Sequence, residues 1–125
     1  GEDVADKLRL ALVGCGAICD WHRMGIRAVP EIEIAATVDV DRARAEAAAA
    51  EYGAEAFASL DEALARGKFD AVDLMLPHDL HEEATLKCFA AGKHVLLEKP
   101  MATRLDACER ILAASRRASP ASPAS

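Results

Sequence analysis

Residues 8–19 read LRLALVGCGAIC, and this stretch decides the fold. The apolar run at 8–13 is typical of a buried strand, and it stops at a glycine. Gly14 and Gly16 then lead into a segment at 17–28 that carries apolar residues at helical spacing. This order predicts a tight backbone turn whose N–H groups point outward at the start of the helix.

The rest of the chain repeats this alternation of strand and helix. Asp41, Ser59 and Thr103 are residue types that cap helices, and each precedes an expected helix. Strands are expected at 8–13, 32–38, 56–57, 69–76 and 95–97, and helices at 17–28, 41–52, 59–67, 81–91 and 103–117. Strands that alternate with helices through short turns predict an α/β fold, a doubly wound parallel sheet of five strands.

The end of the chain differs in composition from the rest. From Ser115 it reads SRRASPASPAS, and prolines cannot continue a helix or join a central strand. We therefore expect one domain over residues 1–117 and a disordered Ser/Ala/Pro tail over 118–125. A linker to a further part of a protein is the alternative that stays open.

The glycine turn has the spacing of a dinucleotide-binding loop. In the pattern GxGxxG the first glycine permits the turn and the second lets a pyrophosphate approach the backbone. The third position is normally glycine or alanine, which allows close packing of helix on strand; here it is Cys19. The expected pyrophosphate-binding residues are Gly14, Gly16, Ala17 and Ile18.

An acidic residue follows the second expected strand. Asp39 lies 20 residues after Cys19 (39 minus 19), which is the spacing at which an acid hydrogen-bonds the ribose hydroxyls of NAD. Its charge would repel the extra phosphate of NADP. Arg42 is close in sequence and could pair with that phosphate, so the sequence favours NAD but leaves NADP open.

Polar residues also follow the fourth and fifth expected strands. The segment at 77–81 reads PHDLH, and the segment at 98–100 reads EKP. Ligands of open α/β sheets bind outside the carboxyl ends of the strands. Together with Asp39, these segments therefore predict a single ligand site at one edge of the sheet.

These motifs carry a resemblance to a known family. The segment LPHDLH at 76–81, followed by GKHVLLEKP at 92–100, resembles the nucleotide-binding half of the Gfo/Idh/MocA oxidoreductases, which are Rossmann-fold proteins. The similarity runs from about residue 8 to about residue 117. It implies hydride transfer between a nicotinamide cofactor and a sugar, a cyclitol or a related polyol or carbonyl substrate.

The resemblance also implies roles for particular residues. Lys99 would be the catalytic residue near the nicotinamide, where an ammonium can stabilise a developing alkoxide. Glu98 and Pro100 would shape the turn that holds it, and Pro77 and His81 would line the nicotinamide-ribose side. Many relatives carry Asn where this chain has His78, so the resemblance leaves the contact of His78 open.

Relatives in this family continue with a sixth strand and a second domain that carries the substrate pocket, and neither is expected in these 125 residues. The exposed sheet edge predicts pairing with a partner strand or a second copy of the chain. Three functions therefore stay open: a cofactor domain of an oxidoreductase, a module that holds NAD without turnover or docks on a partner chain, and a methyltransferase. The EKP segment argues against the third.

Composition excludes other function classes. The formal net charge is −6, from 15 basic and 21 acidic residues, which argues against nucleic-acid binding. The four cysteines are scattered without a CxxC pair or a histidine cluster, so no metal site is predicted. The apolar runs are shorter than the roughly 20 residues that span a bilayer, and no signal-peptide pattern begins the sequence. We expect a soluble, cytoplasmic protein with no membrane partner.

Overall fold

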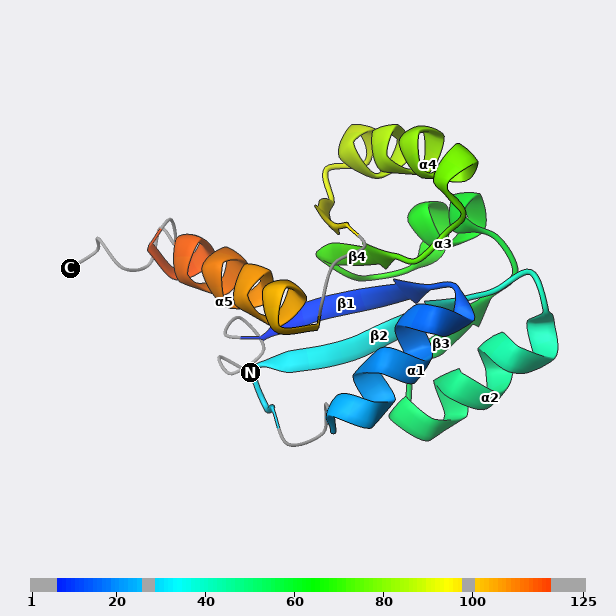
Figure 1. Ribbon diagram of the computed structural model, residues 1–125, viewed down its shortest axis with the longest axis horizontal. Helices are drawn as coiled ribbons and strands as arrows, with labels where there is room; N and C mark the ends of the chain where they lie inside the picture. Colours follow the sequence, from blue (N-terminus) through cyan, green and yellow to red (C-terminus); the bar gives the residue numbers. More distant parts are fainter. Residues whose placement is uncertain (1–6, 26–28, 98–100, 118–125) are drawn as a thin grey trace.

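The computed structural model describes residues 7–25, 29–97 and 101–117 (Figure 1). Within them, helices and strands alternate along the chain. The elements are β1 (Leu8–Val13), α1 (Cys15–Met24), β2 (Ile32–Val38), α2 (Arg42–Tyr52), β3 (Glu55–Phe57), α3 (Leu60–Arg66), β4 (Ala71–Leu74), α4 (His78–Ala90), β5 (His94–Leu96) and α5 (Met101–Arg117). The expected α/β fold with five strands is confirmed, whereas the expected tail at 118–125 lies outside the described residues.

All strand pairs in the sheet are parallel, and the order across it is β3-β2-β1-β4-β5. The chain therefore runs outward from β1 through β2 to β3 and then returns to the other side of β1. Val13 at the end of β1 pairs with Val38 on one side and with Leu74 on the other. The reversal of strand order at β1 creates the crevice where ligands of such sheets bind.

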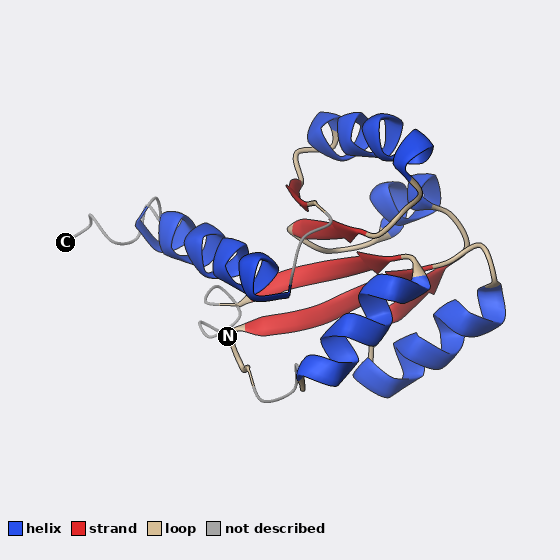
Figure 2. Cartoon of the chain, in the orientation of Figure 1, coloured by secondary structure: helices blue, strands red, loops and turns tan. Residues whose placement is uncertain are grey.

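Helices cover both faces of the sheet (Figure 2). One core cluster joins the sheet to α1 and α5 through side chains such as Trp21 and Leu112. The other joins it to α3 and α4 through Ala63 and Cys88. The central strand β1 is buried along nearly its whole length, with Leu10, Ala11 and Leu12 fully inaccessible, as expected for a strand packed on both faces.

Two of the expected helix caps are confirmed. The Asp41 carboxylate accepts hydrogen bonds from the N–H groups of Ala43 and Arg44, and the Ser59 hydroxyl accepts one from the Glu62 N–H at 3.1 Å. The Glu62 side chain pairs with Arg66. These caps satisfy N–H groups that have no partner inside the helix.

Other element ends differ from the expectation. α1 ends at Met24 because Gly25 adopts a left-handed conformation, φ +73°, and caps it. α4 begins at His78, three residues early, directly after Pro77, whose fixed φ suits a helix start. Thr103 lies inside α5, which begins at Met101, so the predicted cap at Thr103 is wrong. β4 is shorter than expected because its regular pairing is confined to 71–74.

Candidate functional site

The glycine turn lies at the carboxyl end of the central strand. The Gly14 N–H donates to the Val38 carbonyl at 2.9 Å, and the Met75 N–H donates to the Val13 carbonyl at 3.0 Å. Gly14 has φ +94°, and a Cβ there would lie 2.4 Å from the Met75 carbonyl oxygen. A Cβ on Gly16 would lie 2.8 Å from Met75 Cγ. Both glycines are therefore required by contact with the segment after β4, a reason that the sequence pattern alone does not give.

The start of α1 is suited to an anion. Gly14 is its N-cap and provides no side-chain hydrogen bond, and no acidic residue lies in the first turn. The first N–H groups of a helix lack intrahelical partners and carry partial positive charge. Ala17 is buried against the sheet, and Ile18 is half-buried. The expected packing role of the third position is wrong, because Cys19 is exposed and Ala17 makes the close approach.

Asp39 lies beside the glycine turn, one residue beyond the Val38 carbonyl that binds Gly14. Only 9% of it is exposed. Its N–H donates to the Phe57 carbonyl at 3.2 Å, and its Oδ1 accepts from the Asp41 N–H at 2.8 Å. The carboxylate is thus held at the end of β2 in a fixed orientation. The structure brings the predicted ribose acid and the predicted pyrophosphate loop together.

Arg42 is the first residue of α2 and its side chain is exposed. Its guanidinium lies 3.8 Å from Glu46 Oε2, one helical turn further along. The positive charge of Arg42 is therefore partly balanced by the carboxylate of Glu46.

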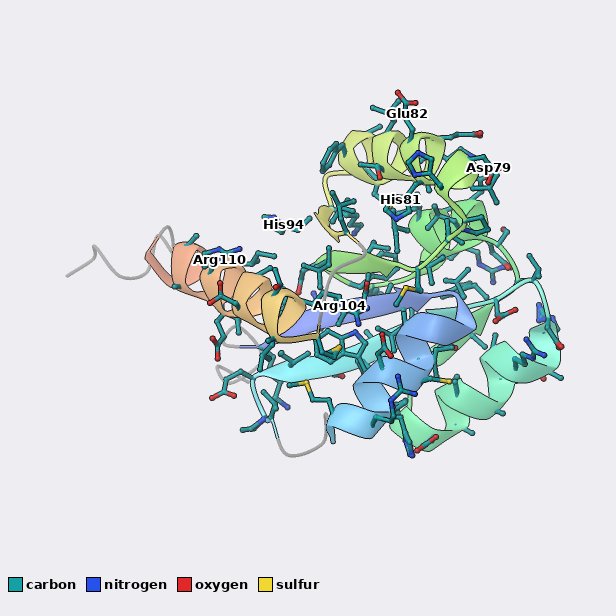
Figure 3. The ribbon with its side chains drawn as sticks, viewed as in Figure 1. Asp79, His81, Glu82, His94, Arg104 and Arg110 are labelled. Atoms are coloured by element: carbon teal, nitrogen blue, oxygen red, sulfur yellow. The ribbon has the colours of Figure 1, made fainter. Side chains whose placement is uncertain are left out.

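The junction of β4 and α4 holds the next group of predicted residues. The His81 Nε2–H donates to the Leu74 carbonyl at 3.3 Å, which anchors the half-buried ring on the end of β4. In Figure 3 His81 points from α4 toward the sheet, whereas Asp79 and Glu82 point away from it. Pro77 and His78 are exposed at the helix start. A cavity of about 460 Å³ is lined here by His78, Asp79, His81, Glu82, Thr85, Leu86 and Leu97.

The predicted residues Glu98, Lys99 and Pro100 lie outside the described residues, so their roles stay predictions. The described chain reaches Leu97 after β5 and resumes at Met101. Leu97 is exposed and shares the cavity with the first turns of α4.

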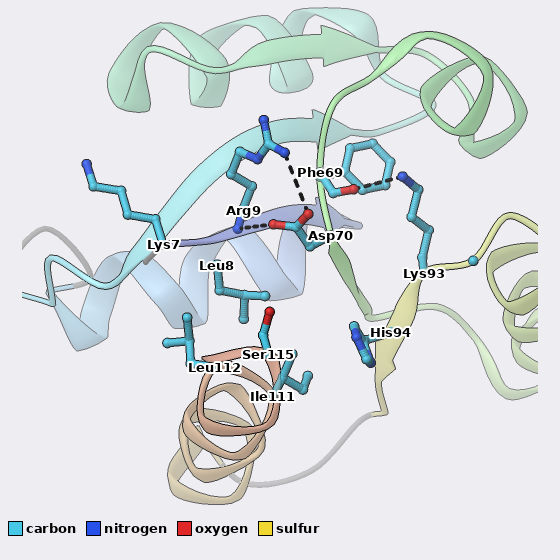
Figure 4. Close-up of a pocket in the computed structure, with 11 residues that line it drawn as sticks. Lys7, Leu8, Arg9, Phe69, Asp70, Lys93, His94, Ile111, Leu112 and Ser115 are labelled. Carbon is cyan, nitrogen blue, oxygen red and sulfur yellow. Dashed lines mark hydrogen bonds and ion pairs between the residues drawn. The ribbon is translucent and has the colours of Figure 1, made fainter. Parts of the chain in front are cut away.

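A second hollow lies at the opposite, amino-terminal end of the strands (Figure 4). It has a volume of about 360 Å³ and is lined by the starts of β1, β4 and β5 and by the last turns of α5. Lys93 donates to the Phe69 carbonyl there, and Arg9 pairs with Asp70. Because it is at the far end of the sheet from Gly14 and Asp39, it does not belong to the predicted ligand site.

Sequence reasoning missed a buried polar cluster that joins α1, β4 and α5. Trp21 Nε1 donates to Asp73 Oδ2 at 2.6 Å, and Arg104 bridges Asp73 at 3.1 Å and Asp20 at 2.5 Å. Asp73 is fully buried and Arg104 is 2% exposed. Burial raises the pKa of Asp73, against the opposing effects of the Trp21 hydrogen bond and the Arg104 charge. The signal was present in the sequence, since a carboxylate inside an apolar strand requires a buried partner.

In the described part of the chain, no helix is long and apolar enough to cross a membrane. No group of three or more histidine, cysteine or acidic side chains in these same ranges is arranged to hold a metal ion.

Dehydrogenases are among the known proteins that the chain resembles. The chain is 36% identical over 110 residues to a 4-carboxy-2-hydroxymuconate-6-semialdehyde dehydrogenase of Sphingobium sp., covering 87% of this chain and 35% of the relative. It is 37% identical over 112 residues to an inositol 2-dehydrogenase of Ralstonia nicotianae, covering 87% and 33%. The chain therefore spans about a third of the length of these curated relatives.

A solved structure shares the fold. The WlbA dehydrogenase from Bordetella pertussis, crystallised in complex with NADH and UDP-GlcNAcA, is similar with a TM-score of 0.66 and 35% identity, covering 83% of this chain and 32% of that one. The family model described as "Oxidoreductase family, NAD-binding Rossmann fold" matches residues 8–121. This match sets aside the methyltransferase alternative. The chain belongs to the Gfo/Idh/MocA oxidoreductase family and represents its NAD-binding Rossmann domain.

Proposed function

We propose that the chain binds NAD(H) along the carboxyl edge of its sheet, as the cofactor domain of an oxidoreductase. One observation carries this proposal: the helix start at Gly14, which has no side-chain cap, is hydrogen-bonded to Val38, the residue before the oriented and nearly buried Asp39. The helix start suits the pyrophosphate, with the N–H groups of Gly16, Ala17 and Ile18 nearest to it. Asp39 suits the adenosine ribose, whose two hydroxyls need an acceptor.

The geometry of Asp39 favours NAD over NADP. Its Oδ1 already accepts from the Asp41 N–H, which leaves Oδ2 to accept from a ribose hydroxyl. A phosphate on that ribose would meet the negative charge of Asp39 at close range. Arg42 offers only partial compensation, because Glu46 lies against its guanidinium.

The nicotinamide half of the cofactor would lie toward β4 and β5. His81 and Pro77 stand at the end of β4, and His78 lines the adjoining cavity. NAD supplies the hydride acceptor when bound. Lys99, with Glu98 and Pro100 around it, would hold a positive charge beside the reacting oxygen of the substrate.

The substrate class follows from the relatives. An inositol 2-dehydrogenase and a dehydrogenase crystallised with UDP-GlcNAcA are among them, so we propose a sugar, a cyclitol or a related polyol or carbonyl compound. A site formed by the Rossmann domain alone does not enclose such a substrate or exclude water from the hydride path. Hydride transfer is therefore proposed for the whole protein.

The alternative is a module that holds NAD without turnover or docks on a partner chain. Cytoplasmic location and pairing of the β5 edge also stay predictions.

Titration with NADH and NADPH tests the proposal. Trp21 is the one tryptophan in the chain, and bound NADH absorbs light where tryptophan emits, so energy transfer from Trp21 measures binding directly. We expect saturable binding of NADH, weaker binding of NADPH, and loss of NADH affinity in Asp39→Ala. Oxidation of a polyol with NAD is tested in the whole protein, because the Rossmann domain alone does not enclose a substrate. Turnover there supports the enzyme, and NADH binding without turnover there supports the module. Absence of binding to either cofactor refutes the proposal.

A further inference from the structure

The buried cluster of Asp20, Trp21, Asp73 and Arg104 joins three elements that meet at the proposed cofactor site. Asp20 and Trp21 lie on α1, the helix that begins at the glycine turn. Asp73 lies on β4, two residues before Met75, which contacts both glycines of that turn. Arg104 lies in the first turn of α5. A single guanidinium thus connects α1 and β4 to the start of α5.

Burial of these charges is not explained by stability alone. Asp73 Oδ1 and Arg104 Nε are buried without a hydrogen-bond partner among the described residues. A buried ion pair commonly contributes no more to stability than well-packed apolar residues of the same size. In this cluster the hydrogen bonds from Trp21 and Arg104 to carboxylate oxygens constrain orientation as well as distance, because a hydrogen bond weakens steeply as its angle departs from linear.

The cluster gives α1 a second point of attachment on the sheet. The first is the glycine turn against Met75, and the second, at Trp21, lies five residues after Gly16, roughly 7.5 Å along the helix at about 1.5 Å per residue. Two separated attachments define the axis of the helix. A third bond, from Arg104 to Asp20, fixes its rotation about that axis. The direction in which the first N–H groups of α1 point depends on both.

We propose that Arg104 is a positioning residue of the dinucleotide site, which acts through Asp73 and Asp20 to hold the N-terminus of α1 aimed at the pyrophosphate. Arg104 is 2% exposed and does not contact the cofactor itself. The inference rests on the proposed function, because it assumes that a dinucleotide binds at the start of α1.

The test measures NADH affinity, thermal stability and Trp21 emission in the 125-residue chain and its variants. Arg104→Met removes the guanidinium, and Arg104→Lys keeps the charge but can reach one carboxylate only. Leu112→Ala is the matched control for Arg104→Met, since Leu112 is a buried residue near the other end of α5. Leu112 packs in the same apolar core as Trp21 but takes no part in the hydrogen bonds of the cluster, so its truncation destabilises the same helix and leaves those bonds in place.

Asp20→Asn provides a milder variant with its own control. It weakens the bond from α1 to Arg104 but leaves Arg104 paired with Asp73. The Asp20 carboxylate also pairs with exposed Arg23. Arg23→Ala therefore removes this surface ion pair and leaves the bond from Arg104 to Asp20 in place. Trp21 emission reports whether the indole N–H keeps its bond to Asp73.

We expect NADH binding at least tenfold weaker in Arg104→Met, partly restored in Arg104→Lys, and several-fold weaker in Asp20→Asn. Leu112→Ala and Arg23→Ala should stay within about twofold of the parent chain. Parent-like affinity in Arg104→Met, or an equal loss in Leu112→Ala, overturns the role. If Arg104→Met does not fold, parent-like affinity in both Arg104→Lys and Asp20→Asn overturns it. Failure of the parent chain to bind NADH refutes the proposed function and this role with it, whereas normal parent binding with unaffected variants refutes the role alone.

Discussion

Replacement of Gly14 by alanine should damage both the fold and the cofactor site. Gly14 has φ +94° and ψ 144°, a conformation that is essentially restricted to glycine and costs other residues on the order of 1–3 kcal/mol. The new Cβ would also lie 2.4 Å from the Met75 carbonyl oxygen, a backbone atom that cannot rotate away. Forcing a methyl group into such a contact costs about 1–3 kcal/mol more. Gly14→Ala should therefore lower the free energy of unfolding by about 2–6 kcal/mol.

Gly53 offers a control with one of these two penalties. It caps α2 with φ +67°, but nothing lies within 4 Å of the position its Cβ would take. Gly53→Ala should cost only about 1–2 kcal/mol. In a domain of this size we expect Tm to fall by about 5 °C for Gly53→Ala and about 10–20 °C for Gly14→Ala, followed by far-ultraviolet circular dichroism. NADH affinity should fall in Gly14→Ala alone. Equal losses of Tm in the two variants would refute the packing of the glycine turn on Met75.

Three further predictions concern charge and burial. Asp39→Asn should weaken NADH binding about tenfold or more, because it removes the charged acceptor for a ribose hydroxyl. It should also reduce the preference for NADH over NADPH, because the repulsion between Asp39 and the extra phosphate of NADPH is lost. An unchanged ratio of the NADH and NADPH affinities would contradict the assignment. Burial raises the pKa of the Cys88 thiol to about 11 and of the Cys108 thiol to about 12, so both should resist alkylation at pH 8 until urea unfolds the chain; rapid labelling of either in the folded chain would show that it is not enclosed. Asp73 has its pKa raised by burial above the ordinary 3.8, so its contribution to stability is full below the unfolded pKa and is lost as the pH rises through the folded pKa. The Tm of Asp73→Asn relative to the parent chain should therefore increase with pH above about 4, and a difference independent of pH would refute this direction.

The parts of the fold that follow from local sequence signals are those the sequence predicts well. β1, the glycine turn and the acid at the end of β2 each depend on residues adjacent in the chain, and the structure confirms their arrangement. The caps at Asp41 and Ser59 are equally local. The expected helix at 17–28 extends too far, because Gly25 adopts a left-handed conformation and ends α1 at Met24.

Long-range contacts account for most of what the sequence does not reveal. The Gly14 contact with Met75 joins residues from different strands, and the bond between Asp20 and Arg104 joins residues separated by 84 positions. Local patterns identify a charge that needs a partner, but many arginines and lysines could supply it. At Cys19 a local pattern was misleading. A small residue at the third position of the glycine pattern usually allows close packing of helix on strand, but the Cys19 side chain is exposed and does not pack there.

A crystal structure of the chain soaked with NADH tests the central claim most directly, because it reports where each part of the cofactor lies. We predict the pyrophosphate within hydrogen-bond distance of the N–H groups at Gly16 and Ala17, and a ribose hydroxyl on Asp39 Oδ2. The nicotinamide should lie toward His81. Density for the dinucleotide elsewhere, for example in the hollow at the amino ends of the strands, or a pyrophosphate with no contact to the start of α1, would contradict the account.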